Sequence, residues 1–258
     1  MRIEVNGHGL QVEQSGPPSG RPLVLLHHGL GSIVSWHKQA PALAEAGYFV
    51  TAYDRWGYGG SDPRPSLDAP LFQQDMADLA ALIRQLGLEE PVLIGHSDGG
   101  TIAVYMAACC PERVSGLAVI AAHIYIEEKM LPAILAVQKT FQEDARFRQG
   151  LRRLHADKTE AVFSNWFEGW LKEEHLTWDI RPLLGRITCP AWVVQGEADE
   201  HATPQQARDL AAGIPGAQLW LAEGAGHMLP QDQAENFNRR LFGFLSGLPD
   251  RKEKNKNV

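Results

Sequence analysis

The chain has 258 residues, of which 44% are hydrophobic and 21% are charged, and its formal net charge is −7. This balance is typical of a globular protein, and no basic stripe interleaved with aromatic residues suggests a nucleic-acid partner. The longest apolar stretch, residues 117–126, is far shorter than the roughly 20 residues of a membrane-spanning helix, and the first residues contain no apolar signal region. We therefore expect a cytoplasmic protein without a membrane anchor.

The first half of the chain alternates short apolar runs with amphipathic stretches. Residues 2–5 and 10–14 flank Asn6-Gly7-His8-Gly9, which predicts a β-hairpin. Nearly continuous apolar runs predict strands buried on both faces, and apolar residues at helical spacing predict helices. The predicted strands are 23–27, 48–54, 91–95 and 114–122, and the predicted helices are 35–47, 71–87 and 98–110. This order predicts an α/β protein with a mostly parallel sheet and helices on both faces.

The alternation stops at residue 123 and resumes near residue 186. The interval contains helical patterns without a clear strand, and four of its aromatic residues recur at i, i+3, i+4 and i+7, on one face of a helix. They are Phe163, Trp166, Phe167 and Trp170. Further strands are predicted at 190–196 and 217–223, and helices at 204–214 and 232–245. We expect a core made of residues 1–122 and 186–247, a helical cap or lid over 123–185, and a disordered tail over 248–258.

The stretch Gly95-His96-Ser97-Asp98-Gly99 joins a predicted strand to a predicted helix. A serine on such a sharp turn has its hydroxyl raised above the sheet, and the crowded turn needs small flanking residues. The N-terminus of the following helix places free backbone amides beside the reacting oxygen. This setting predicts that Ser97 is a nucleophile, whereas His96 is expected to be a packed residue of the turn.

With these motifs the chain resembles the α/β-hydrolase superfamily over residues 1–247. Residues 28–31, His-Gly-Leu-Gly, stand where the family has H-G-x-G, and residues 54–61 are similar to its D-x-x-G-x-G-x-S turn. The resemblance implies a mostly parallel eight-stranded sheet with helices on both faces and a helical cap insertion. It also implies a serine esterase-like enzyme with a Ser-His-Asp triad, although a fold alone does not fix the reaction.

A serine nucleophile needs a histidine base and a carboxylate that orients this base. In the family the order along the chain is serine, acid, histidine. His227 lies in Gly-Ala-Gly-His after the strand 217–223 and resembles the family's histidine. Asp199 follows the strand 190–196 in the family's G-x-x-D position. The resemblance therefore implies a triad of Ser97, His227 and Asp199.

Other residues remain as alternatives for the base and the acid. His123 and His201 lie on loops near the predicted site and could serve as the base. Glu200 could replace Asp199 as the acid, because the next proline comes one residue later than in the commonest family spacing. His155 and His175 belong to the polar part of the insertion and are expected on the surface.

By resemblance, the oxyanion hole is formed by the backbone amides of Leu30 and Asp98. The Asp98 side chain has three interpretations: a helix-start acid that suits the helix dipole, a group that contacts another part of the pocket, or a nucleophile of the haloalkane dehalogenase and epoxide hydrolase type. The last needs aspartate at the position of Ser97. Under the first, Asp98→Ala or Asp98→Asn keeps most activity. The candidate substrate-binding residues are His123, Tyr125, Trp166, Trp170 and Met228.

No cofactor and no metal site are expected. Neighbouring His27 and His28 point to opposite sides of an extended segment and lack further ligands, and by resemblance His28 ties loops together. The three cysteines have no disulfide spacing and are expected to be buried thiols.

The sequence thus predicts a serine hydrolase that cleaves a small, mostly apolar carboxylic ester, lactone or thioester through an acyl-enzyme. Two other reactions on the same triad remain open: hydrolysis of a carbon–carbon bond and cofactor-free perhydrolysis. A ligand receptor with slow or no turnover is an alternative of another class.

Overall fold

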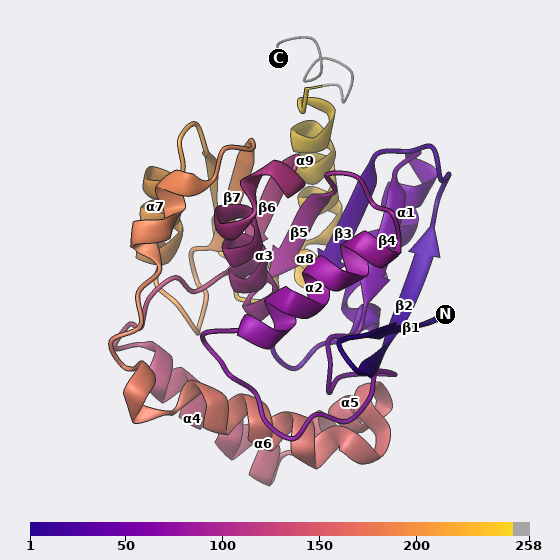
Figure 1. Cartoon of the computed structure of the whole chain (residues 1–258). Helices are drawn as coiled ribbons and strands as arrows, with labels where there is room; N and C mark the ends of the chain where they lie inside the picture. The colour runs from indigo at the N-terminus through magenta and orange to yellow at the C-terminus, as the bar shows by residue number, and fades with distance from the viewer. Residues whose placement is uncertain (250–258) are drawn as a thin grey trace.

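A computed structural model describes residues 1–249 and contains one eight-stranded sheet (Figure 1). The strand order is β1-β2-β4-β3-β5-β6-β7-β8. The β1–β2 and β2–β4 pairs are antiparallel, and the other neighbouring strands are parallel. The strands are β1 (Arg2–Val5), β2 (His8–Ser15), β3 (Pro22–Leu26), β4 (Phe49–Tyr53), β5 (Val92–His96), β6 (Gly116–Ile120), β7 (Ala191–Gly196) and β8 (Gln218–Ala222). The predicted fold class is therefore confirmed.

Helices cover both faces of the sheet, as the continuous apolar strands require (Figure 1). Along β3, Val24 and Leu26 belong to one hydrophobic cluster, and Leu23 and Leu25 belong to the other. Successive side chains of a strand point to opposite faces, so each face of β3 needs its own apolar cover. One face is covered by α2 (Gln73–Gln85), α3 (Asp98–Cys109) and α7 (Pro204–Gly213), and the other by α1 (Ala40–Glu45), α8 (Leu229–Asp232) and α9 (Ala234–Ser246).

The segment between β6 and β7 forms a separate helical layer at one end of the sheet (Figure 1). We call residues 123–185 the helical insertion. It contains α4 (Met130–Glu143), α5 (Ala145–His155) and α6 (Thr159–Trp170). Asp144 ends α4 and caps α5, because its side chain accepts the amide of Arg146 at 2.7 Å. Phe141 of α4 stacks on Phe163 of α6 with ring centroids 3.8 Å apart, so that part of the predicted aromatic face packs within the insertion.

Several local expectations are wrong. The predicted helix 35–47 is divided into a 3-10 turn (Ile33–Trp36) and α1. Cys109 is exposed and Cys110 is half-buried, so only Cys189 is a buried thiol. Leu248, assigned to the tail, is buried in the cluster around α9; residues 250–258 of that tail lie outside the described residues. Within residues 1–249, no helix combines the length and apolarity needed to cross a bilayer.

Candidate active site

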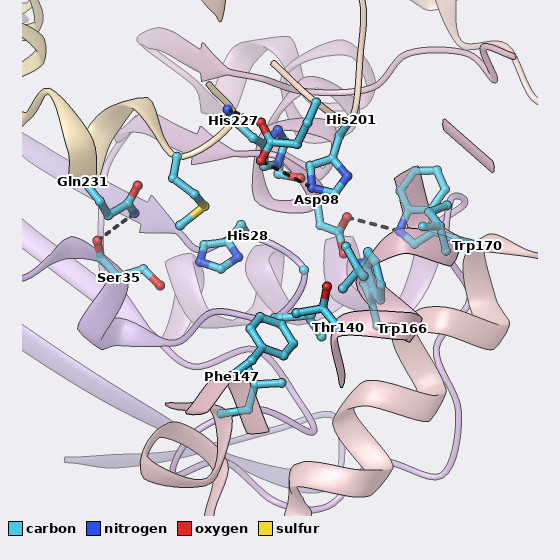
Figure 2. A pocket seen from close by; sticks show the side chains of 18 of the residues that line it. His28, Ser35, Asp98, Thr140, Phe147, Trp166, Trp170, His201, His227 and Gln231 are labelled. Carbon is cyan, nitrogen blue, oxygen red and sulfur yellow. Dashed lines mark hydrogen bonds and ion pairs between the residues drawn. The ribbon is translucent and has the colours of Figure 1, made fainter. Parts of the chain in front are cut away.

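Loops at the carboxyl ends of the parallel strands meet the helical insertion around one cavity of about 530 Å³ (Figure 2). His28 follows β3, Ser97 follows β5, His123 follows β6, and His227 follows β8. All four line this cavity. The carboxyl ends of parallel strands lie at one edge of a sheet, so the predicted site residues meet although they are distant in sequence.

Ser97 occupies the strained turn between β5 and α3. Its backbone has φ 54° and ψ −121°, and its amide donates to the carbonyl of Ile120 at 2.8 Å. A Cβ atom on Gly99 would lie 2.3 Å from the carbonyl oxygen of Leu26, and one on Gly95 would lie 2.3 Å from the carbonyl oxygen of Gly99. Only glycine permits this packing, so the turn has the crowded geometry that the sequence predicts for a nucleophile position.

His227 is bound to Asp199. The His227 Nδ1 and the Asp199 Oδ2 are 2.9 Å apart, and the Asp199 side chain is fully buried. Asp199 also accepts the side-chain amide of Gln195 at 2.6 Å and the backbone amide of His201 at 2.8 Å. With Nδ1 donating to this carboxylate, Nε2 of the neutral His227 ring carries the free lone pair. Within residues 1–249 the Ser97 hydroxyl makes no hydrogen bond, although Ser97 and His227 line the same cavity.

The ionisation of this pair departs from ordinary values. Burial acts to raise the pKa of Asp199, but the charge and hydrogen bond of His227 outweigh it and hold that pKa well below its usual range. Burial acts to lower the pKa of His227, but Asp199 outweighs it and raises that pKa above the ordinary value. An ionised Asp199 therefore makes His227 a stronger base than a free imidazole.

The surrounding histidines behave in the opposite way. Burial, followed by repulsion from His227, lowers the pKa of His96 to about 3 and the pKa values of His123 and His201 to about 4. His96 donates from Nε2 to the His227 carbonyl at 2.9 Å, which fits the predicted packed role. The His201 ring lies 4.5 Å from the His227 ring. Among these four histidines, His227 alone has a raised pKa and a buried carboxylate partner on its ring.

Glu200 contacts a different part of His227. Its carboxylate accepts the His227 backbone amide at 3.1 Å, whereas the ring binds Asp199. The structure therefore places Asp199, and not Glu200, in the position from which an acid orients the imidazole.

The turn over residues 28–31 lies against the nucleophile turn. Gly31 closes it by donating its amide to the His28 carbonyl at 3.0 Å. A Cβ atom on Gly29 would lie 2.9 Å from Asp98 Oδ2, which shows how closely the two turns approach. The backbone amides of Leu30 and Asp98 make no hydrogen bond to another of residues 1–249. Both amides are thus free to donate to a group bound in the cavity, which Leu30 and Asp98 line.

The Asp98 carboxylate is buried at the side of the cavity and makes two contacts, of which Figure 2 shows the one with Trp170. Oδ1 accepts the indole Nε1 of Trp170 at 3.2 Å, and Oδ2 lies 3.4 Å from Arg55 Nη2. Arg55 is also paired with Asp75 at 3.2 Å. Burial raises the pKa of Asp98, and Arg55 opposes this shift. The side chain begins α3 but also contacts other groups of the pocket, so the helix-dipole interpretation is incomplete.

Four of the five candidate substrate-binding residues line the cavity: His123, Trp166, Trp170 and Met228. Tyr125 does not, because its hydroxyl donates to Asp209 at 2.9 Å and its ring packs under Arg181. Much of the apolar wall comes instead from α4 and α5, which contribute none of these five candidates. Those residues are Met130, Ile134, Val137, Phe147, Leu151 and Leu154. The sequence shows the helical spacing of these apolar residues. It does not show that the apolar face of the two helices lines a cavity.

The expectations about three other histidines need correction. The His27 ring ties loops together, because it accepts the Arg55 amide on Nε2 at 3.0 Å and donates from Nδ1 to the His28 carbonyl at 2.8 Å. His28 contacts the Arg55 loop through its carbonyl, which lies 3.5 Å from Arg55 Nη2, whereas its side chain lines the cavity. His155 and His175, expected on the surface, are both buried. Residues 1–249 contain no cluster of side chains suited to hold a metal ion.

Comparisons with known proteins agree with the fold. A family model described as the alpha/beta hydrolase fold matches residues 22–177. The chain is 30% identical over 251 residues to the serine hydrolase BPHL of Homo sapiens, which covers 95% of this chain and 85% of that protein. It is 35% identical over 313 residues to epoxide hydrolase A of Mycobacterium tuberculosis, with 95% and 97% covered.

Among solved structures, the enol-lactonase from Burkholderia xenovorans LB400 superposes with a TM-score of 0.79 at 24% identity, covering 95% of this chain and 100% of that one. At this identity the likeness shows the fold alone. The family model, the relatives and the sheet topology lead to the same conclusion: this chain is an enzyme of the α/β-hydrolase family.

Proposed function

We propose that the protein is a serine hydrolase that cleaves a small, mostly apolar carboxylic ester through an acyl-enzyme. The observation that carries this proposal is the meeting of Ser97, on its strained turn, and the Asp199–His227 pair in one cavity of about 530 Å³. Cavities of this size hold drug-sized ligands. The names of relatives range from serine hydrolase to epoxide hydrolase, so the bond that is cleaved has to be argued from the site.

In the proposed mechanism, Ser97 Oγ attacks the ester carbonyl while its proton moves to His227 Nε2. The amides of Leu30 and Asp98 donate to the resulting oxyanion. Collapse of the tetrahedral intermediate breaks the carbon–oxygen bond, and His227 returns the proton to the departing alcohol. Water, deprotonated by His227, then attacks the acyl-enzyme, and the acid and the free Ser97 hydroxyl are released. Asp199 stays ionised and holds the imidazole in one orientation.

The cavity wall supports the substrate class. The side chains of α4 and α5 offer an apolar surface to one part of the substrate, and the residues that line the cavity include neither lysine nor arginine, so no cation is present there for a polyanionic group. His123 adds an imidazole ring to the lining of the cavity. Lactones and thioesters offer the same electrophilic carbonyl and fit the same chemistry. We infer that the helical insertion acts as a cap that excludes water from this cavity.

The identity of the residue at the nucleophile position distinguishes ester cleavage from epoxide opening. Opening an epoxide through a covalent ester intermediate requires a carboxylate at the nucleophile position, and Ser97 stands there. Asp98 is the first residue of α3, and its carboxylate is engaged by Trp170 and Arg55. These contacts favour acyl transfer over epoxide opening.

The test is labelling with a fluorophosphonate, followed by identification of the labelled residue, and assay of p-nitrophenyl esters from acetate to laurate. We expect label on Ser97 and a kcat at least ~10⁴-fold lower in Ser97→Ala. Ser246→Ala, at the exposed end of α9, is the matched control and keeps the wild-type rate. Wild-type turnover in Ser97→Ala refutes the proposal. If a diketone is turned over faster than any ester, the reaction is carbon–carbon hydrolysis. If peroxide and a carboxylic acid react faster than any ester, it is perhydrolysis. Ligand binding without turnover identifies a receptor.

A further inference from the structure

His155, at the end of α5 in the helical insertion, reaches into the core and is fully buried. Its ring lies between two core loops. Nδ1 is 3.1 Å from the backbone nitrogen of Gly59, and Nε2 is 3.1 Å from the backbone oxygen of Leu30. The Gly59 amide can only donate, so Nδ1 accepts, and the ring proton must sit on Nε2, from which it is donated to Leu30. The two contacts therefore define one neutral tautomer, and burial also lowers the pKa of His155.

The Leu30 backbone has few other supports. Leu30 is a central residue of the turn that Gly31 closes on the His28 carbonyl at 3.0 Å, and Arg55 Nη2 reaches the same carbonyl at 3.5 Å. These bonds hold the first residue of the turn. Among residues 1–249, the carbonyl of Leu30 itself is held by His155.

We propose that His155 is a positioning residue for the oxyanion hole, through which the helical insertion fixes the direction of the Leu30 backbone. This inference rests on the proposed function, in which the Leu30 amide stabilises the oxyanion. That amide and the Leu30 carbonyl belong to the two peptide groups joined at one Cα atom. Holding the carbonyl restricts rotation about Leu30 and keeps the amide aimed at the site where charge develops.

The expected effect on kcat and KM depends on the stage of the reaction at which the oxyanion forms. A carbonyl becomes an oxyanion only in the transition state, so a loosened donor lowers kcat more than it alters KM. Removal of one oxyanion donor typically costs about 10²–10³ in kcat. His155 aims the donor without being the donor, so we expect His155→Leu to lower kcat by about 10–100-fold with KM changed less than about threefold.

Two further variants separate positioning from general support of the fold. In His155→Gln the side-chain oxygen can accept from Gly59 while its NH₂ group donates to Leu30, so this variant should recover most of the lost kcat. Lys158 provides the matched control, because its ammonium holds the carbonyls of Tyr58 and Ser61 in the same loop as Gly59 without contacting Leu30. Lys158→Met should loosen the insertion and lower the Tm while kcat stays within about twofold of wild type.

The experiment measures kcat, KM and Tm for the three variants on the preferred p-nitrophenyl ester, together with the rate of fluorophosphonate labelling at Ser97. A reduced kcat in His155→Leu, recovery in His155→Gln and normal kcat in Lys158→Met support the proposal. An unchanged kcat in folded His155→Leu overturns it, as does an equal loss in Lys158→Met. If His155→Leu does not fold, His155→Asn, whose shorter amide reaches one partner only, takes its place. Absence of labelling on Ser97 in the wild type refutes the proposed function itself, which is a separate outcome.

Discussion

Removal of the Asp98 carboxylate is the perturbation whose cost the structure defines best. Asp98→Ala deletes the acceptor for the Trp170 indole and one of the two carboxylates that face Arg55. A buried donor left without its acceptor costs about 1–3 kcal/mol. Loss of a sole buried ion partner costs about 3–5 kcal/mol, but Arg55 keeps Asp75, so we assign about 1 kcal/mol to this contact. The free energy of unfolding should fall by about 2–4 kcal/mol.

Asp98→Asn provides the comparison. Its side-chain oxygen still accepts from Trp170, so we expect a loss of only about 1 kcal/mol, from the weakened contact with Arg55. Because the Asp98 backbone amide remains in place, kcat of the Asn variant should stay within about tenfold of wild type. Urea unfolding, followed by tryptophan fluorescence and far-UV circular dichroism, measures the free energy of unfolding. Ester hydrolysis measures kcat.

Two results would refute this reasoning. Equal unfolding free energies for the Ala and Asn variants would show that the Trp170 contact does not stabilise the fold. A loss of several orders of magnitude in kcat, in an Asn variant that is as stable as expected, would show that the carboxylate takes part in the reaction and not only in packing.

Three further outcomes are expected. The value of kcat/KM should rise with pH through a His227 pKa above the ordinary value of 6.5, because His227 must be neutral to act as the base. Asp199→Asn should shift this rise to lower pH, because it removes the charge that raises the His227 pKa. An unchanged pH dependence in Asp199→Asn contradicts the pairing of Asp199 with the catalytic base. Gly99→Ala, whose Cβ would lie 2.3 Å from a carbonyl of β3, should abolish labelling of Ser97, while Gly150→Ala, with 3.9 Å of clearance in α5, should not. Phe163→Ala removes half of a buried aromatic stack and should lower the free energy of unfolding, measured in urea, by about 3 kcal/mol; a change below about 1 kcal/mol would show that the stack matters little.

Much of the fold follows from local sequence patterns. Continuous apolar runs specified the parallel strands, because a strand buried on both faces tolerates no polar alternation. The strand–turn–helix context of Ser97 specified a strained turn, because only glycine fits at Gly95 and Gly99. The family order then indicated Asp199 and His227, and the sheet brings them into contact because the carboxyl ends of its strands share one edge. The strands and the Ser97 turn depend on backbone geometry that a few neighbouring residues determine, whereas the Asp199–His227 contact also depends on the pairing of β7 with β8.

Contacts between polar side chains from distant segments could not be predicted in this way. His155 belongs to a polar helix pattern and looks like a surface residue, yet the packing of α5 on the core buries it against Leu30 and Gly59. Arg55 and Asp98 likewise meet because the loop after β4 approaches the start of α3. A sequence pattern shows which face of a helix is apolar, but not which surface that face covers. The sequence by itself determined the sheet, the nucleophile turn and the candidate triad, and the tertiary structure alone decided which buried groups hold that site in shape.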